Sequence, residues 1–107
     1  MRKILATAAV AAVAAAPAYA ATTVKVGDDW FVKPGNGNKT VSKNTVVKWK
    51  NTGDSPHTVT VKKGPVKFKS SIKDSGTFTR KMTKKGTYTI VCTIHGSADQ
   101  KMRLVVR

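Results

Sequence analysis

The stretch after residue 20 shows no helical stripe of apolar residues. Short segments rich in Val, Thr, Tyr, Phe and Trp instead alternate with clusters of Gly, Pro, Asn, Asp and Lys. Such segments, bounded by turn residues, are typical of strands. We expect strands at residues 22–26, 39–42, 45–50, 57–62, 77–82, 87–92 and 101–106. Residues 70–75 fit a helical turn. The regular spacing predicts an all-β Greek-key β-sandwich of about seven to eight strands.

Alternation within these segments supports the strand assignment. Val47 and Trp49 can face the interior while the lysines beside them face water, because successive side chains of a strand point to opposite sides. In the segment 87–92, Tyr88, Ile90 and Cys92 share one face by the same rule. The sequence therefore predicts that Cys92 points into the sandwich.

The first 20 residues indicate a secretory signal peptide. Arg2 and Lys3 give a basic start, residues 4–16 form an apolar run, and a small-x-small triplet ends at Ala20. The run is too short to span a bilayer. We expect cleavage after Ala20, which leaves a single domain at residues 21–107 in the periplasm or outside the cell.

A single cysteine cannot form a disulfide within the chain, so Cys92 needs another explanation in an oxidising compartment. His95 and Gln100 follow it at short offsets, and the other histidine of the chain, His57, lies far upstream. Two imidazoles, a thiolate and a weak axial donor describe a blue-copper centre. The alternatives are a small buried apolar cysteine and a histidine that bonds only to backbone.

Four segments together resemble a known family. They are residues 31–34, a Trp-bearing strand at 46–51, a Pro-His pair within 54–59, and a Gly-x-Tyr strand that leads into Cys-x2-His within 86–95. This combination is similar to the cupredoxins, most closely the plastocyanin-like and pseudoazurin-like members, over most of the mature chain. The resemblance implies a cupredoxin-like sandwich, one copper ion that cycles between Cu(II) and Cu(I), and electron transfer between redox partners.

By that resemblance His57, Cys92 and His95 match the family's histidine, thiolate and second histidine ligands. The fourth position has two candidates. Met102 is the familiar donor but lies seven residues after His95, whereas Gln100 lies five residues after it and needs no loop insertion when counted back from the closing strand. An amide oxygen is a recognised axial alternative. We favour Gln100 and keep Met102 as the alternative.

Two further residues are expected around the ligands. The resemblance places the backbone amide of Thr58 against the Cys92 sulfur, where such contacts tune a metal site. Asn51 either ties the upstream ligand loop to the copper loop or forms an Asx-turn ahead of Gly53.

Enzymatic copper chemistry of the multicopper-oxidase or nitrite-reductase kind needs further histidines, and this chain has two in total. Its five acids form no convincing acid/base pair, and Ser97 has no free histidine partner. We therefore expect an electron carrier and no enzyme. The alternatives are a copper-trafficking module, for which Met82 and Met102 form no cluster, and a metal-free basic binding domain of the same fold.

Charge points to the kind of partner. The chain carries +15, and removal of Arg2 and Lys3 leaves 18 basic against 5 acidic residues, or +13, in the mature domain. Such a surface steers the protein toward acidic redox partners or an anionic membrane or cell surface, with association that weakens as salt rises. No nucleic-acid recognition motif is present. We expect a monomer.

Overall fold

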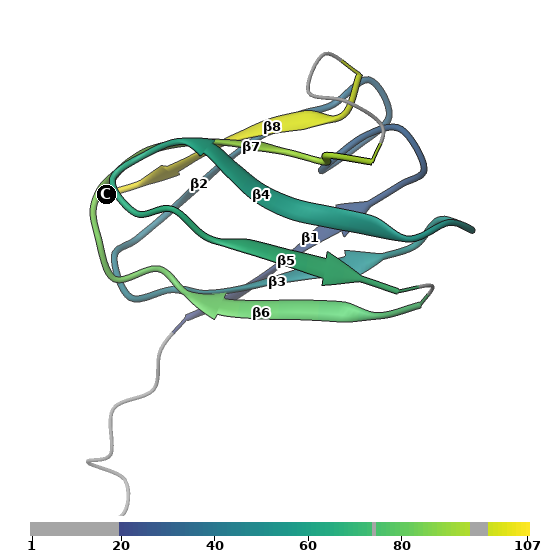
Figure 1. The fold of residues 1–107 in the computed structure, drawn as a ribbon. Coiled ribbons are helices and arrows are strands. Elements are labelled where there is room, and N and C mark those ends of the chain that lie inside the picture. The colour runs from purple at the N-terminus through teal and green to yellow at the C-terminus, as the bar shows by residue number, and fades with distance from the viewer. Residues whose placement is uncertain (1–19, 74, 95–98) are drawn as a thin grey trace, which may run out of the picture.

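The computed structural model describes residues 20–73, 75–94 and 99–107, which form two β-sheets packed face to face (Figure 1). No helix occurs in these residues. The eight strands, in chain order, are β1 (Ala21–Val26), β2 (Asn38–Val41), β3 (Val46–Asn51), β4 (His57–Lys63), β5 (Lys69–Ile72), β6 (Thr77–Lys81), β7 (Gly86–Val91) and β8 (Lys101–Val106). The predicted all-β Greek-key sandwich is confirmed, and the seven predicted strands differ from the observed ones by at most one residue at either end.

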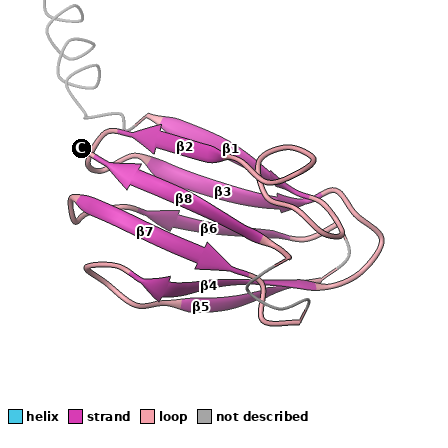
Figure 2. Ribbon diagram, turned by 90° about the horizontal axis from the view of Figure 1, so that it is seen from above, coloured by secondary structure: helices cyan, strands magenta, loops and turns pink. Residues whose placement is uncertain are grey.

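The two sheets are mixed. One has the order β1-β3-β6 and the other β2-β8-β7-β4-β5. β1 runs parallel to β3 and β2 runs parallel to β8, while the remaining neighbours are antiparallel. Figure 2 shows the strands of both sheets along one long direction, with the loops gathered at the two ends. Functional residues on these loops are therefore held by a rigid framework.

Alternation in the sequence becomes burial in the sandwich. On β3, Val47 and Trp49 are fully buried while Lys48 and Lys50 are exposed. The same rule brings Tyr88, Ile90 and Cys92 into the core cluster. Both expectations from the sequence are confirmed.

The prediction of a helical turn at residues 70–75 is wrong for its first half. Lys69–Ile72 is strand β5, which pairs antiparallel with β4 so that Ile72 lies opposite His57. Ile72 is 2% exposed, so burying this one side chain against the core fixes the segment as an edge strand. A tertiary contact therefore overrides the weak local preference of a Lys-Ser-Ser-Ile sequence.

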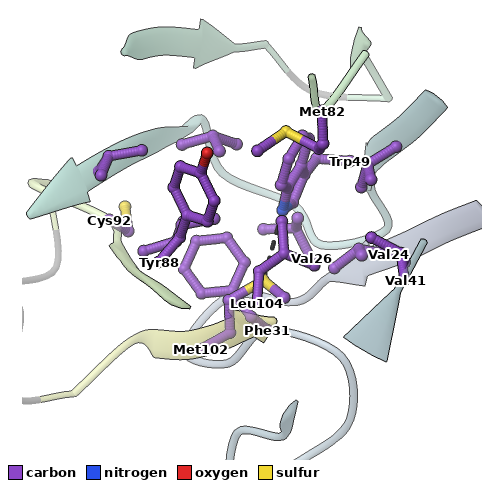
Figure 3. Packing of buried hydrophobic residues seen from close by; sticks show 14 of the residues in the cluster. Val24, Val26, Phe31, Val41, Trp49, Met82, Tyr88, Cys92, Met102 and Leu104 are labelled. Carbon is purple, nitrogen blue, oxygen red and sulfur yellow. Dashed lines mark hydrogen bonds between the residues drawn. The ribbon is translucent and has the colours of Figure 1, made fainter. Parts of the chain in front are cut away.

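Aromatic side chains fill the centre of the sandwich. Trp49 lies directly opposite Phe78 in the β3–β6 register, and their ring centroids are 5.6 Å apart in a stacked arrangement. Phe68 contacts both rings, and the Arg80 guanidinium lies 4.4 Å above Phe68. Figure 3 shows the buried apolar cluster to which Trp49 belongs, with Cys92 among the labelled side chains.

One end of the sandwich carries several residues for which the sequence predicts a functional role. β3 ends there, β4 and β8 begin there, and β7 ends there, at the end away from the C-terminus (Figure 1).

The signal-peptide prediction falls on residues 1–20, of which 1–19 lie outside the described residues. Within residues 20–73, 75–94 and 99–107 the structure contains no helix that is both long and apolar enough to cross a membrane.

Candidate metal centre

Cys92 directly follows β7 and lies at the rim of the core with no exposed surface. Its thiol forms no disulfide. Its backbone N–H donates to the carbonyl of Gln100 at 3.1 Å, so the chain segments on both sides of the intervening loop are joined there. The thiol is thus held in place and shielded from water, which limits its oxidation.

His57 is the first residue of β4 and is also fully buried. Its Nδ1 lies 3.8 Å from the Cys92 Sγ. Two residues that are 35 positions apart in the sequence are therefore neighbours, because β4 and β7 pair in one sheet. This is the contact that the sequence predicted from the spacing of its few metal-binding side chains.

Thr58, the residue after His57 on β4, also contacts the Cys92 sulfur. Its backbone N–H donates to the Cys92 Sγ at 3.4 Å, which confirms the contact expected for this amide. Its hydroxyl accepts a hydrogen bond from the Thr93 N–H at 2.9 Å and lies 3.1 Å from the Thr60 hydroxyl. Thr58 therefore links β4 to the chain immediately after Cys92, and a thiolate at this position already has one donor.

Gln100 is fully buried, and its amide group is fixed by two backbone carbonyls. Nε2 donates to the Gly27 carbonyl at 2.8 Å and to the Trp30 carbonyl at 3.0 Å. If the amide were flipped, its oxygen would face two carbonyl acceptors, so these contacts assign the nitrogen to this side and Oε1 to the other. The Oε1 atom is buried and has no hydrogen-bond partner in the described part of the chain. A buried acceptor without a donor is costly unless something else occupies it.

Met102, the other candidate for the fourth position, lies two residues further along β8 and is 3% exposed. Its sulfur accepts a hydrogen bond from the Trp49 indole Nε1 at 3.4 Å, drawn as a dashed line in Figure 3. Its side chain belongs to the apolar cluster with Leu104. The thioether is therefore already engaged in the core.

Asp28 is a residue of the site that sequence reasoning missed. Its Oδ1 lies 3.3 Å from His57 Nε2 and accepts hydrogen bonds from Asp54 N, Ser55 N and Ser55 Oγ at 2.8 to 3.1 Å. Desolvation raises the pKa of this carboxyl, but the hydrogen bonds, led by that of the Ser55 backbone, outweigh it and hold the pKa below 3.8. The sequence signal is weak, because an Asp after a Gly reads as an ordinary turn residue.

Asn51 shows the Asx-turn that the sequence left as one of two possibilities. Its Oδ1 accepts from Gly53 N at 2.9 Å. Its Nδ2 donates to the Ser55 carbonyl at 2.7 Å and to the Lys73 carbonyl at 3.2 Å. Asn51 thus ties the loop before His57 to the turn after β5.

The described residues bring His57, Cys92 and Gln100 to one end of the sandwich. The third predicted ligand, His95, lies outside the described residues. Within the part of the chain that the structure describes, no three His, Cys, Asp or Glu side chains are arranged so that they could hold a metal ion by themselves. The donors that are present fit copper, since a thiolate, an imidazole nitrogen and an orphaned amide oxygen are the ligand types of a blue-copper site.

Comparison with known proteins identifies the fold. No curated protein sequence matches significantly. A methionine-to-glutamine variant of amicyanin in the Cu(I) form matches at 26% identity with a TM-score of 0.67, covering 88% of this chain and 89% of that chain. A methionine-to-alanine variant, also Cu(I), matches at 24% with the same coverage and TM-score. The family model described as a cupredoxin-like domain matches residues 3–106. The sandwich with His57 and Cys92 at one end therefore belongs to a member of the cupredoxin-like family.

Proposed function

We propose that this protein is a small exported type 1 copper protein that carries one electron at a time between redox partners. The observation that carries the proposal is the contact between His57 Nδ1 and Cys92 Sγ at the loop end of a cupredoxin-like domain. The two similar solved structures described above are both of amicyanin in a Cu(I) form. Copper, when bound, would supply a centre that takes up and gives back a single electron.

The chain contributes a rigid ligand frame. His57, Cys92 and His95 would supply the imidazoles and the thiolate. Support comes from the backbone around them: His57 begins β4, Thr58 N–H donates to the Cys92 sulfur, and Cys92 N–H donates to Gln100. Ligands whose positions are fixed by sheet hydrogen bonds move little between two charge states, and small movement keeps the barrier to electron transfer low.

We assign the axial position to Gln100 rather than Met102. Gln100 Oε1 is a buried acceptor without a hydrogen-bond partner in the described part of the chain, whereas the Met102 sulfur already accepts from Trp49. An amide oxygen is a harder donor than a thioether and stabilises Cu(II) more than Cu(I). The reduction potential should therefore be lower than that of a methionine-ligated variant of the same protein.

Electron transfer is favoured over catalysis because the chain has two histidines in total, and this proposal uses both. It is favoured over copper trafficking because Met82 and Met102 are 2% and 3% exposed, so neither offers a surface thioether to Cu(I). A leader removed after Ala20 would deliver the domain to the periplasm or the cell exterior.

The partner should be acidic. On the sheet β1-β3-β6, Lys25 and Lys50 are register partners, Lys48 lies on the same face of β3, and all three are exposed. With +13 on the mature domain, association with an acidic redox partner should be fast and should slow as ionic strength rises.

The test is the visible absorption and EPR spectrum of the Cu(II)-loaded mature domain, for wild type, Gln100→Met and Met102→Ala side by side. We expect an intense thiolate-to-copper band in wild type, a shift of that band in Gln100→Met, and no shift in Met102→Ala. Absence of the band in wild type would overturn the carrier assignment. A band that responds to Met102 and ignores Gln100 would return the axial position to Met102.

Reversible electrochemistry separates the carrier from a trafficking protein. A carrier cycles between its two oxidation states and keeps its copper, and Gln100→Met should raise the potential. A domain that loses copper on reduction would instead support transport of the metal.

A further inference from the structure

The turn formed by residues 27–30, which we call the 27–30 turn, contributes none of the predicted ligands yet contacts two of them. It follows β1 and is closed by a hydrogen bond from Gly27 N to the Trp30 carbonyl at 2.9 Å, and Phe31 beyond it bridges back to Val26. A Cβ on Gly27 would lie 2.1 Å from the Trp30 indole, so the turn closes this tightly because residue 27 is glycine. Its shape is therefore fixed independently of the ligand loops.

The Asp28 side chain reaches from this turn to the loop before β4. Its Oδ1 takes three hydrogen bonds from Asp54 and Ser55 and lies 3.3 Å from His57 Nε2. A Cβ on Gly53 would lie 2.1 Å from the same oxygen, so glycine at 53 is what leaves space for the carboxylate. The carboxylate is thus built into the loop that carries His57, with donors on several sides.

The contact determines which nitrogen of His57 carries the proton. A neutral imidazole has one N–H, and a carboxylate beside Nε2 can only accept, so the N–H sits on Nε2. Nδ1 then keeps its lone pair, and this is the nitrogen that faces the Cys92 sulfur at 3.8 Å. A carboxylate that accepts from the far nitrogen of a ligating histidine also raises the basicity of that ligand.

The backbone of the same turn fixes the second ligand. Gly27 and Trp30 present their carbonyls to Gln100 Nε2, and Oε1 has no hydrogen-bond partner among residues 20–73, 75–94 and 99–107. One tight turn therefore orients His57 through the Asp28 side chain and the Gln100 amide through its backbone carbonyls.

We propose that Asp28 is a positioning residue of the metal site, which fixes the tautomer and ring orientation of His57 and lowers the reduction potential through its negative charge. The claim about the reduction potential rests on the proposed electron-carrier function. The claim about the His57 tautomer concerns the metal-free protein and does not depend on that function.

The first test is NMR on the metal-free domain. Long-range ¹⁵N–¹H correlation reports which ring nitrogen of each histidine is protonated, and the chain has two histidines, so His95→Gln assigns the signals. Wild type and the Asp29→Ala control, which alters the exposed neighbouring acid, should show the Nε2–H tautomer of His57. Asp28→Ala should lose that preference. An unchanged tautomer in folded Asp28→Ala would overturn the proposal.

The second test is the reduction potential of copper-loaded Asp28→Asn and Asp29→Asn at equal ionic strength. Asn at 28 keeps an acceptor for Ser55 and removes the charge beside His57, whereas Asn at 29 removes the same charge without that contact. Asp28→Asn should shift the one-electron equilibrium toward the reduced state by about tenfold, about 59 mV, and Asp29→Asn by clearly less. Equal shifts would overturn the proposal.

The two tests also separate this proposal from the proposed function. If wild type lacks a thiolate-to-copper band, the carrier assignment fails, and the NMR result on the metal-free protein still decides the role of Asp28. If the band is present and both Asp28 readouts match those of Asp29, the carrier assignment stands and the positioning role fails.

Discussion

The centre of the sandwich and its loop end are both buried, but they are built from different chemistry. The centre holds Trp49, Tyr88 and Leu104 with no exposed surface, whereas the loop end buries His57, Asn51 and Gln100. Apolar groups need only to be covered, while each buried polar group needs a correctly placed partner. The centre should therefore determine how stable the protein is, and the loop end should determine what the site can bind.

Gln100, which directly precedes β8, and Met102, on β8, show the same contrast two residues apart. The Met102 sulfur accepts a hydrogen bond from Trp49 and packs in the core, while the buried Gln100 Oε1 has no hydrogen-bond partner among the described residues. The boundary between the apolar core and the polar loop end thus runs between these two buried residues.

Trp49→Ala is the strongest test of the centre. It removes the largest fully buried side chain, its stacking on Phe78 and its hydrogen bond to Met102. We expect the free energy of unfolding to fall by about 3 to 5 kcal/mol, measured by urea denaturation of the metal-free domain. A loss below about 1 kcal/mol would mean that the centre does not carry the stability we assign to it.

Asn51→Ala tests the loop end by removing three hydrogen bonds and leaving the Ser55 and Lys73 carbonyls without their donor. We expect a loss of about 2 to 3 kcal/mol in the same denaturation experiment. Asn51→Asp keeps the acceptor for Gly53 but sets a buried carboxylate against the Ser55 and Lys73 carbonyls, so it should cost more than alanine. A loss below about 1 kcal/mol for the alanine variant would contradict the role of these hydrogen bonds.

Met102→Leu sharpens the boundary between the two regions. Because the volume is kept and a single weak hydrogen bond from Trp49 is lost, we expect a cost below about 1.5 kcal/mol and an unchanged copper spectrum. A large spectral change with little loss of stability would place Met102 in the site rather than in the core.

Tyr88→Phe has the smallest expected effect, and it depends on pH. Burial raises the pKa of Tyr88 above 10.0, an effect that the Arg80 charge partly offsets. Below that value both folded and unfolded chains are neutral at Tyr88. As the pH rises past it, the unfolded chain ionises first, so stability is lost until the pH passes the folded pKa.

Urea denaturation between pH 9 and 11 checks this, with wild type and Tyr88→Phe compared at each pH so that lysine titration cancels. At neutral pH the variant should lose about 0.5 to 1.5 kcal/mol with the hydrogen bond to the Lys84 carbonyl. The difference should shrink as the pH rises, and a constant difference would argue against the raised pKa.

Strand positions could be predicted because Val, Trp and Lys alternate with period two, as on β3, and this pattern survives into the fold. β5 could not, because Lys69–Ile72 has one apolar residue and becomes a strand only through pairing with β4. His57 and Cys92 could be paired in advance, since few other metal-binding side chains exist in the sequence.

The role of Asp28, by contrast, could not be predicted from the sequence. Its contact to His57 spans 29 positions and depends on how a turn after β1 lies against a loop after β3, two parallel strands. No local pattern encodes that placement. The hydrogen bond from Trp49 to the Met102 sulfur, which spans 53 positions, could not be predicted from the sequence for the same reason.

The placement of β8 makes assembly of the site an all-or-nothing event. β8 is the last strand described, yet it lies inside its sheet between β2 and β7. During synthesis β2 has no strand to pair with until residues 101–106 have emerged, and pairing across such a distance is slow. Gln100 arrives with that strand, and its carbonyl then takes the Cys92 N–H. A nascent chain therefore carries Cys92 without its contact to Gln100 until β8 docks, and the same docking step brings in the Gln100 amide.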